Sequence, residues 1–168
     1  LHLSLRRQRQ MCIRDSYFVV AHFHYVLIGG TMFSFIAGVY YWYPKMTGKM
    51  MNEKLGITHF AATFITFNAA FYPMHNVGIS GMPRRYATYD ASLTELNQFI
   101  SIFAILYGLA QLIFVYNVFY SYRNGKEAGD NPWNGWSLEW ATSSPPPENS
   151  FIEIPTLLDA EEEAKKSE

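Results

Sequence analysis

The hydrophobic pattern divides the chain into three long apolar stretches, which polar segments separate. Residues 17–44, about 56–77 and about 96–122 contain no Asp, Glu, Lys or Arg. A helix needs about 20 predominantly apolar residues to cross a membrane, and each stretch is long enough. The pattern therefore predicts an all-α membrane protein with three transmembrane helices.

Prolines and aromatic residues mark the expected ends of these helices. We expect the first helix over residues 16–43 and its end at Pro44, because proline lacks a backbone N–H and its ring clashes with the preceding turn. Residues 40–43 are all aromatic, which is typical of a membrane interface. Pro73 should kink or end the second helix near its outer end.

The distribution of lysine and arginine predicts which helix ends are cytoplasmic. The segment 45–54 carries three lysines against one glutamate, and Arg123 and Lys126 follow the third stretch. Because cytoplasmic loops are enriched in basic residues, both segments are expected inside the cell. The first helix then starts on the outer side. The tail, residues 125–168, is expected to be cytoplasmic and irregular, with a charged, disordered end.

Composition excludes several classes of function. The net charge is −1, so nothing favours nucleic acid as a partner. The single cysteine, Cys12, rules out an intrachain disulfide and any metal site built from several cysteines. The chain contains no G-x-G-x-x-G or P-loop pattern, so a nucleotide site has no support.

Two histidines stand out in the first apolar stretch, because ionisable groups at membrane depth are rare and usually functional. On a helix each residue advances by about 100°, so His22 and His24 point to nearly opposite sides. Such a pair does not suit one small metal ion. Each imidazole can instead serve a separate partner, and imidazole is a common axial ligand of haem iron. The alternative is that both are structural histidines, satisfied by hydrogen bonds inside the protein.

Three motifs carry a resemblance to a known family. The segment Asp15-Ser-Tyr-Phe-Val-Val-Ala-His-Phe-His-Tyr-Val26 is similar to the tenth transmembrane helix of subunit I of the haem–copper oxidases, in particular the bacterial cytochrome c oxidases. Gly81-Met-Pro-Arg-Arg-Tyr86 follows in the family's order, and then Ser137-Leu-Glu-Trp140 with Ser144-Pro-Pro-Pro147. The resemblance covers about residues 17–154. It implies that residues 16–124 are the C-terminal quarter of a twelve-helix bundle.

The resemblance implies a role for five residues. His22 matches the axial ligand of the high-spin haem a3, and His24 matches one of the two axial ligands of the low-spin haem a. Phe23 lies between them as a short route for electrons. Arg84 and Arg85 match an arginine pair that holds haem propionates, and arginine forms bidentate pairs with carboxylates. The alternative for the arginines is that they snorkel at the membrane interface.

Residues 1–15 do not fit the rest of the chain, and we expect them to be a non-native leader. They are basic and contain no segment that fits a secretory signal. In the family, a histidine and an acid precede this helix, and the acid helps to hold a magnesium or manganese ion. Asp15 falls at the position of the acid and Arg14 at that of the histidine. Asp15 is therefore a candidate metal ligand, with a chance match as the alternative.

The resemblance also implies the family's reaction. Electrons pass from cytochrome c through the low-spin haem to haem a3 and copper B, where oxygen is reduced to water and protons are pumped. The expected partners are the rest of subunit I, subunits II and III, cytochrome c, oxygen and the lipid of the bacterial inner membrane. Most copper and haem ligands are expected on earlier helices, so the chain alone should be inactive.

Two other interpretations remain open. A quinol oxidase of the same superfamily would take ubiquinol or menaquinol in place of cytochrome c. Pro83 and residues 144–147 disfavour this interpretation. A three-span membrane protein without catalytic function would contain the histidines by coincidence. That interpretation predicts that replacing His22 or His24 by Ala changes stability and leaves the haem spectrum intact.

Overall fold

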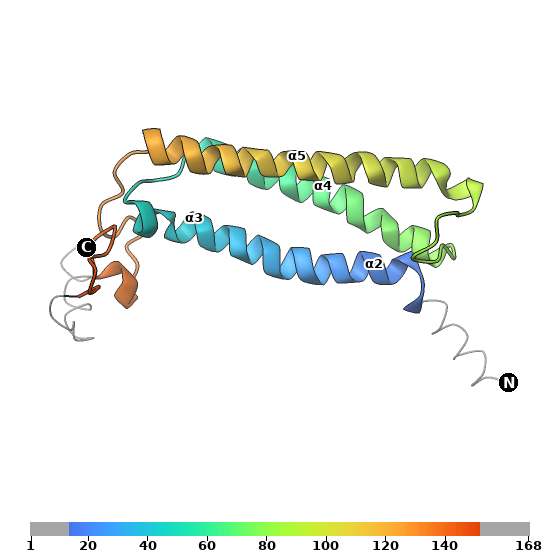
Figure 1. Cartoon of the computed structure of the whole chain (residues 1–168), viewed down its shortest axis with the longest axis horizontal. Coiled ribbons are helices and arrows are strands. Elements are labelled where there is room, and N and C mark those ends of the chain that lie inside the picture. Colours follow the sequence, from blue (N-terminus) through green and yellow to red (C-terminus); the bar gives the residue numbers. More distant parts are fainter. Residues whose placement is uncertain (1–13, 152–168) are drawn as a thin grey trace. The chain divides into compact units, whose positions relative to one another are not determined.

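The computed structural model describes residues 14–151, and these are mainly helical. In chain order the elements are α2 (Tyr17–His24), the π-helix η1 (Tyr25–Met32), α3 (Phe33–Thr47), α4 (Glu53–Ile79), the 3₁₀ helix η2 (Ala91–Leu93), α5 (Thr94–Asn124) and the 3₁₀ helix η3 (Leu138–Trp140) (Figure 1). Within residues 14–151 there is no β-strand, only two isolated bridges. Most of the expected leader and the charged end of the tail lie outside the described residues.

Two helical segments are long and apolar enough to cross a membrane. They are Tyr17–Thr47, which runs through α2, η1 and α3, and Ala91–Asn124, which runs through η2 and α5. Helix α4 has 27 residues but is not one of these two. Its histidines and asparagines lower its hydropathy. The helical fold and two apolar spans are therefore confirmed, and a third span remains a prediction.

Pro44 does not end the first helix, so that part of the prediction is wrong. Helix α3 continues through Pro44 to Thr47. The next residue, Gly48, has a φ of 70°, and its N–H donates to the carbonyl oxygen of Pro44 at 2.7 Å. A left-handed glycine just beyond the last turn is a common helix end, because glycine has no Cβ to oppose that conformation. The glycine sets the end of this helix.

Helix α4 likewise continues beyond its proline. The side chain of Asn52 accepts a hydrogen bond from the N–H of Leu55 at 3.1 Å, which caps the start of the helix. The helix then runs through Pro73 to Ile79. Pro73 therefore does not end it, and the expectation of a kink stays untested. Neighbouring helices can satisfy a backbone that a proline disturbs.

A π-helix interrupts the first helical segment directly after His24. It covers Tyr25–Met32, and the N–H of Phe33 bonds to the carbonyl oxygen of Ile28, five residues earlier. The sequence analysis predicted a helix here without this change of hydrogen bonding. π-Helical segments are rare and occur frequently at functional sites.

The described residues form two compact units. In the first, residues 14–35 and 57–114, three helical segments pack around Phe67, Ala70 and Phe71 of α4. Tyr25, Ile28 and Phe33 cover this core from the first segment, and Phe103 and Tyr107 cover it from α5. A smaller cluster of Val77, Met82 and Ile100 lies with Tyr17, Met74, Leu93 and Leu96. The candidate ligands all lie in this unit.

The second unit contains residues 36–56 and 115–151, and a buried polar cluster joins two of its helices. The Nδ2 of Asn117 donates to the carbonyl oxygen of Asn52 at 3.1 Å, and its Oδ1 accepts from the hydroxyl of Ser121 at 2.9 Å. Asn117 and Ser121 are fully buried. The cluster therefore holds the start of α4 to the end of α5.

In the same unit the tail is held by a buried lysine. The Nζ of Lys45 donates to the carbonyl oxygens of Asp130, Thr142 and Ser143 at 3.1, 2.6 and 3.3 Å. It also lies 5.0 Å from the centre of the Trp140 ring, a cation–π distance. These contacts fix the tail to the end of α3.

Candidate functional site

The His24 side chain is held from two directions. Its Nδ1 lies 2.7 Å from the carbonyl oxygen of Val20, one turn earlier in α2. Its ring stacks on Phe71 of α4, with centroids 4.4 Å apart and planes 17° apart. An Nδ1–H that donates to a carbonyl leaves Nε2 as the free acceptor, which is the usual arrangement of a metal-binding histidine.

His22 has different surroundings. It is exposed, and it makes no hydrogen bond to any residue of the described part of the chain. Ala21, immediately before it, is completely buried. The two imidazoles therefore share a helix but no common pocket, so each is available to a partner of its own.

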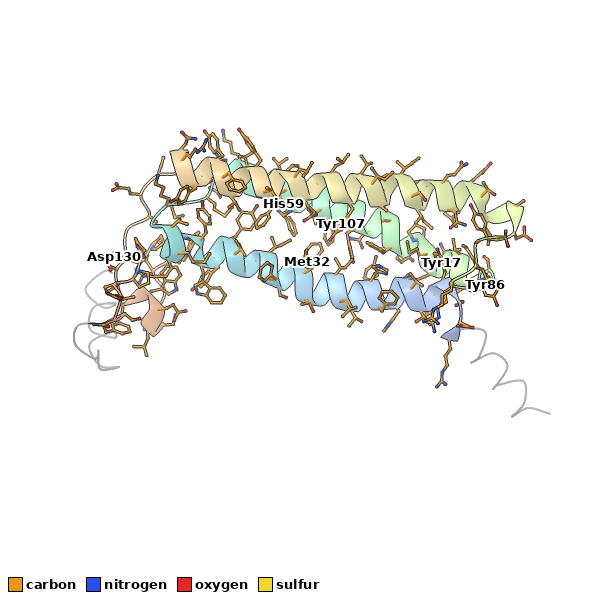
Figure 2. The ribbon with its side chains drawn as sticks, viewed as in Figure 1. Tyr17, Met32, His59, Tyr86, Tyr107 and Asp130 are labelled. Atoms are coloured by element: carbon orange, nitrogen blue, oxygen red, sulfur yellow. The ribbon has the colours of Figure 1, made fainter. Side chains whose placement is uncertain are left out.

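Residues 80–90, between α4 and η2, form the arginine loop, which carries Arg84 and Arg85. This loop is attached to the first turn of α2. The N–H of Tyr17 donates to the carbonyl oxygen of Met82 at 3.0 Å, and the N–H of Arg84 donates to that of Asp15 at 2.9 Å. The Nε of Arg84 also pairs with the Asp15 carboxylate at 3.1 Å. Figure 2 shows Tyr17 and Tyr86, which follows the arginines, at the same end of this unit. The sequence did not predict this pairing of Asp15 with Arg84.

The loop places the arginines near the histidines. Ser16 pairs with Pro83 in an isolated bridge, and His22 is six residues further along the chain. His22 therefore lies roughly 9 Å from that bridge along the helix axis. The terminal nitrogens of Arg84 make no hydrogen bond to described residues. Arg85 is exposed and has a φ of 69°. A left-handed conformation is strained for a residue other than glycine, and such strain is concentrated at functional sites.

At the other end of this loop, Asp90 caps η2. Its carboxylate accepts a hydrogen bond from the N–H of Ser92 at 2.9 Å. Bonding to the Ser92 side chain first, and to its backbone second, lowers the pKa of Asp90 from its ordinary value. The loop is therefore anchored at both ends.

Three residues of α4 fix α2 and η1 in place. A Cβ added to Gly78 would collide with the backbone of Phe18, so the two helices touch there. The His75 ring packs against Phe18 at 5.0 Å and against Tyr25 at 5.6 Å. The hydroxyl of Tyr25 donates to Oδ1 of Asn68 at 2.8 Å.

Sequence reasoning missed Phe71, Gly78 and Asn68 as residues that support the site. They lie more than 40 positions beyond the residues they contact, and no spacing or motif singles them out. The Nδ1 of His75 lies 3.2 Å from the carbonyl oxygen of Tyr72, within hydrogen-bond distance.

His59 is buried in α4, away from the candidate ligands. Its Nε2 lies 3.4 Å from Oε1 of Gln111, and Nε2 of Gln111 donates to the hydroxyl of Thr63 at 3.2 Å. These bonds join α4 and α5 in the way that polar side chains join membrane helices.

No group of three or more His, Cys, Asp or Glu side chains that could hold a metal ion occurs among residues 14–151. His22 and His24 are each a single candidate ligand, of the residue type that fills an axial position of haem iron. Asp15 is paired with Arg84, so this one carboxylate does not by itself fit a magnesium or manganese ion, which binds several oxygen ligands.

Comparison with known proteins decides the family. The sequence pattern of the family described as Cytochrome C and Quinol oxidase polypeptide I matches residues 7–121. The chain belongs to this family. The resemblance predicted from the three motifs is therefore confirmed.

Several relatives of this oxidase family match closely. Proteins named Cytochrome c oxidase subunit 1 from Thermostichus vulcanus, Corynebacterium diphtheriae and Synechocystis are 48, 52 and 50% identical over 145, 149 and 145 residues. Each alignment covers 86% of this chain and 26% of the relative. The chain thus spans about a quarter of the length of these subunits. Subunit I of these oxidases is a membrane protein, in agreement with the two apolar spans.

Proposed function

We propose that this chain supplies one axial imidazole to each of the two haems of a cytochrome c oxidase. His24 serves the low-spin haem a, and His22 serves the high-spin haem a3. The observation that carries the proposal is the separation of the two rings. One is held by Val20 and Phe71, and the other, two residues earlier, is exposed.

The residues present fit both haems. The Nδ1 of His24 lies at hydrogen-bond distance from a carbonyl oxygen, and donation of an Nδ1–H there would leave Nε2 as the atom that meets the iron. When bound, the haems supply electron transfer and the iron that binds oxygen. Phe23 lies between the two ligands and stacks on His24 at 4.4 Å, so the helix itself joins the two ligand positions through one aromatic residue.

Arg84 and Arg85 hold the haem propionates. Asp15 orients the Arg84 guanidinium through Nε, which leaves its terminal nitrogens for a carboxylate partner. Arg85 adds a second permanent positive charge beside it. Asp15 therefore acts here by orienting Arg84. Its role as a ligand for magnesium or manganese would need further ligands from outside residues 14–151.

The rest of the assembly follows from the family and the charge pattern. α4 forms a third span, the Lys45–Lys54 side faces the cytoplasm, and the tail after Arg123 lies there too. The copper B ligands, the second ligand of haem a and the proton channels belong to other parts of subunit I in the bacterial inner membrane. With subunits II and III, the whole enzyme reduces oxygen and pumps protons, and the chain alone is inactive.

Cytochrome c is the favoured electron donor, because the three cited relatives carry that name. The family also includes quinol oxidases. Steady-state oxidation by the purified whole enzyme, with reduced cytochrome c or with a quinol as the only donor, distinguishes the two.

The ligand roles are tested by replacing each histidine by glycine in the full-length subunit within its oxidase. We expect His24→Gly to lose the low-spin haem signal and His22→Gly to lose the high-spin one, measured by optical and electron paramagnetic resonance spectra. Added imidazole should restore the lost signal in each variant. His59→Gln, a change at an imidazole that lies away from the candidate ligands, should keep both signals. Retention of both haems in both glycine variants would refute the proposal.

A further inference from the structure

We propose that Phe71 is a positioning residue that sets the plane in which the His24 imidazole meets the low-spin haem, and thereby tunes the reduction potential of that haem. This inference rests on the ligand role proposed for His24. Phe71 touches neither the iron nor the reacting oxygen, and it acts only through the ring that it stacks on.

One hydrogen bond leaves the His24 ring free to tilt. The bond from Nδ1 to the Val20 carbonyl fixes one edge of the imidazole at 2.7 Å. A single hydrogen bond at one edge still allows the ring to tilt about that contact. The orientation of the plane must therefore come from what lies against the face of the ring.

The ring of Phe71 stacks nearly parallel to the ring of His24. The planes of His24 and Phe71 are 17° apart, whereas those of His24 and Phe23 are 27° apart. Phe23 belongs to the same helix as His24 and is exposed. Phe71 belongs to α4 and is only 7% exposed, so it presents a fixed face to the imidazole.

Two other aromatic rings hold the ring of Phe71 in place. Its ring packs on Phe67 at 5.1 Å and on Tyr107 of α5 at 6.1 Å, the latter nearly edge to face. Aromatic rings in such arrangements prefer defined geometries. Rotation of Phe71 would therefore disturb two further rings, and the orientation of the stack is set by α4 and α5 together.

The orientation of the His24 ring would affect the haem iron that it binds. Groups around a ligand histidine orient it and tune the metal, and hydrogen bonding and surroundings are among the means by which a protein adjusts a haem potential. The plane of an axial imidazole sets how its π-orbitals overlap with those of the iron. A change in that plane should change both the anisotropy of the oxidised low-spin haem and its affinity for an electron.

The test uses Phe71→Leu and Phe71→Met in the full-length subunit within its oxidase. Both replacements fill space without offering a planar face. We expect the low-spin haem to be retained, the largest g value of its resonance spectrum to shift, and its reduced-to-oxidised ratio at the wild-type midpoint potential to change about twofold or more. Phe71→Tyr keeps the ring and should keep the wild-type values.

Phe103→Leu is the matched control, because Phe103 packs on the same core from α5 and has no ring contact with His24 among the described residues. It should leave the g values and the potential unchanged. Unchanged values in Phe71→Leu and Phe71→Met would overturn the inference, as would loss of the low-spin haem in both, which would assign Phe71 a packing role. Neither outcome touches the ligand role of His24, which His24→Gly tests separately.

Discussion

Single side chains decide how closely α2 approaches α4. At Gly78 the absence of a Cβ lets the backbone of Phe18 lie directly against α4. Small residues allow such close approaches between membrane helices. Because Phe18 lies one turn before His22, this contact fixes the part of α2 that carries both candidate ligands.

Gly78→Ala should destabilise the assembled protein by about 1–3 kcal/mol, because the new methyl group meets backbone atoms that cannot move aside like a flexible side chain. The midpoint of heat-induced haem release from the oxidase measures the effect. Gly108→Ala in α5 is the control. Apart from its chain neighbours and the nearby backbone of α5 itself, no described atom lies within 4 Å of the Cβ that it would add, so the midpoint should stay or rise slightly. A Gly78→Ala midpoint equal to that of Gly108→Ala would contradict the close approach.

At the scale of elements, particular residues set the end of α3, the start of α4 and the end of α5. Gly48 ends α3, Asn52 starts α4, and the cluster of Asn117 and Ser121 joins the end of α5 to the start of α4. Polar residues in these positions satisfy backbone groups that the helix ends leave without partners. The cluster therefore determines where α4 begins relative to α5.

Asn117→Ala should lower the free energy of unfolding by about 1–3 kcal/mol, because it removes the hydrogen bonds that the buried Asn117 amide makes with the Asn52 backbone and the Ser121 hydroxyl. Asn124→Ala is the matched control on the same helix. Asn124 is exposed, and its side chain bonds within residues 14–151 only to the Tyr120 carbonyl of its own helix, so its loss should stay within about 0.5 kcal/mol. Unfolding of the detergent-solubilised protein, followed by circular dichroism, compares them. Equal losses would show that the cluster contributes nothing.

At the scale of the whole chain, the tail depends on one buried cation. Lys45 has only 8% of its surface exposed, and its ammonium group serves three carbonyl oxygens of the tail. Trp133 and Trp140 add hydrogen bonds to the Tyr41 carbonyl and hydroxyl, both at 2.9 Å. The irregular tail is therefore held by contacts that have no repeating pattern.

Lys45→Met should loosen the tail while keeping the bulk of the side chain. Hydrogen bonds to a charged donor contribute about 1.5–3 kcal/mol, so the open population should rise about ten- to a hundredfold. Limited chymotrypsin digestion of the solubilised protein, followed at the bond after Trp136, measures this as faster cleavage. The exposed Lys126 provides the control as Lys126→Met, which should be cleaved at the wild-type rate. Identical rates in both variants would exclude the proposed role of Lys45.

The sequence by itself determined the apolar spans, the two-residue spacing of His22 and His24, and the arginine pair. Each of these is a property of neighbours along the chain: hydrophobic runs and helical periodicity need no knowledge of distant residues. For the same reason the three motifs sufficed to predict the family that the comparisons then confirmed.

Only the tertiary structure decided the rest. In the structure α3 continues through Pro44, and a π-helix follows His24. Two further findings are that Asp15 pairs with Arg84 and that Phe71 stacks on His24. The last two join residues more than 40 positions apart, so local propensity carries no information about them. A proline or a carboxylate has an intrinsic preference, but the partners that the fold brings beside it decide whether that preference prevails.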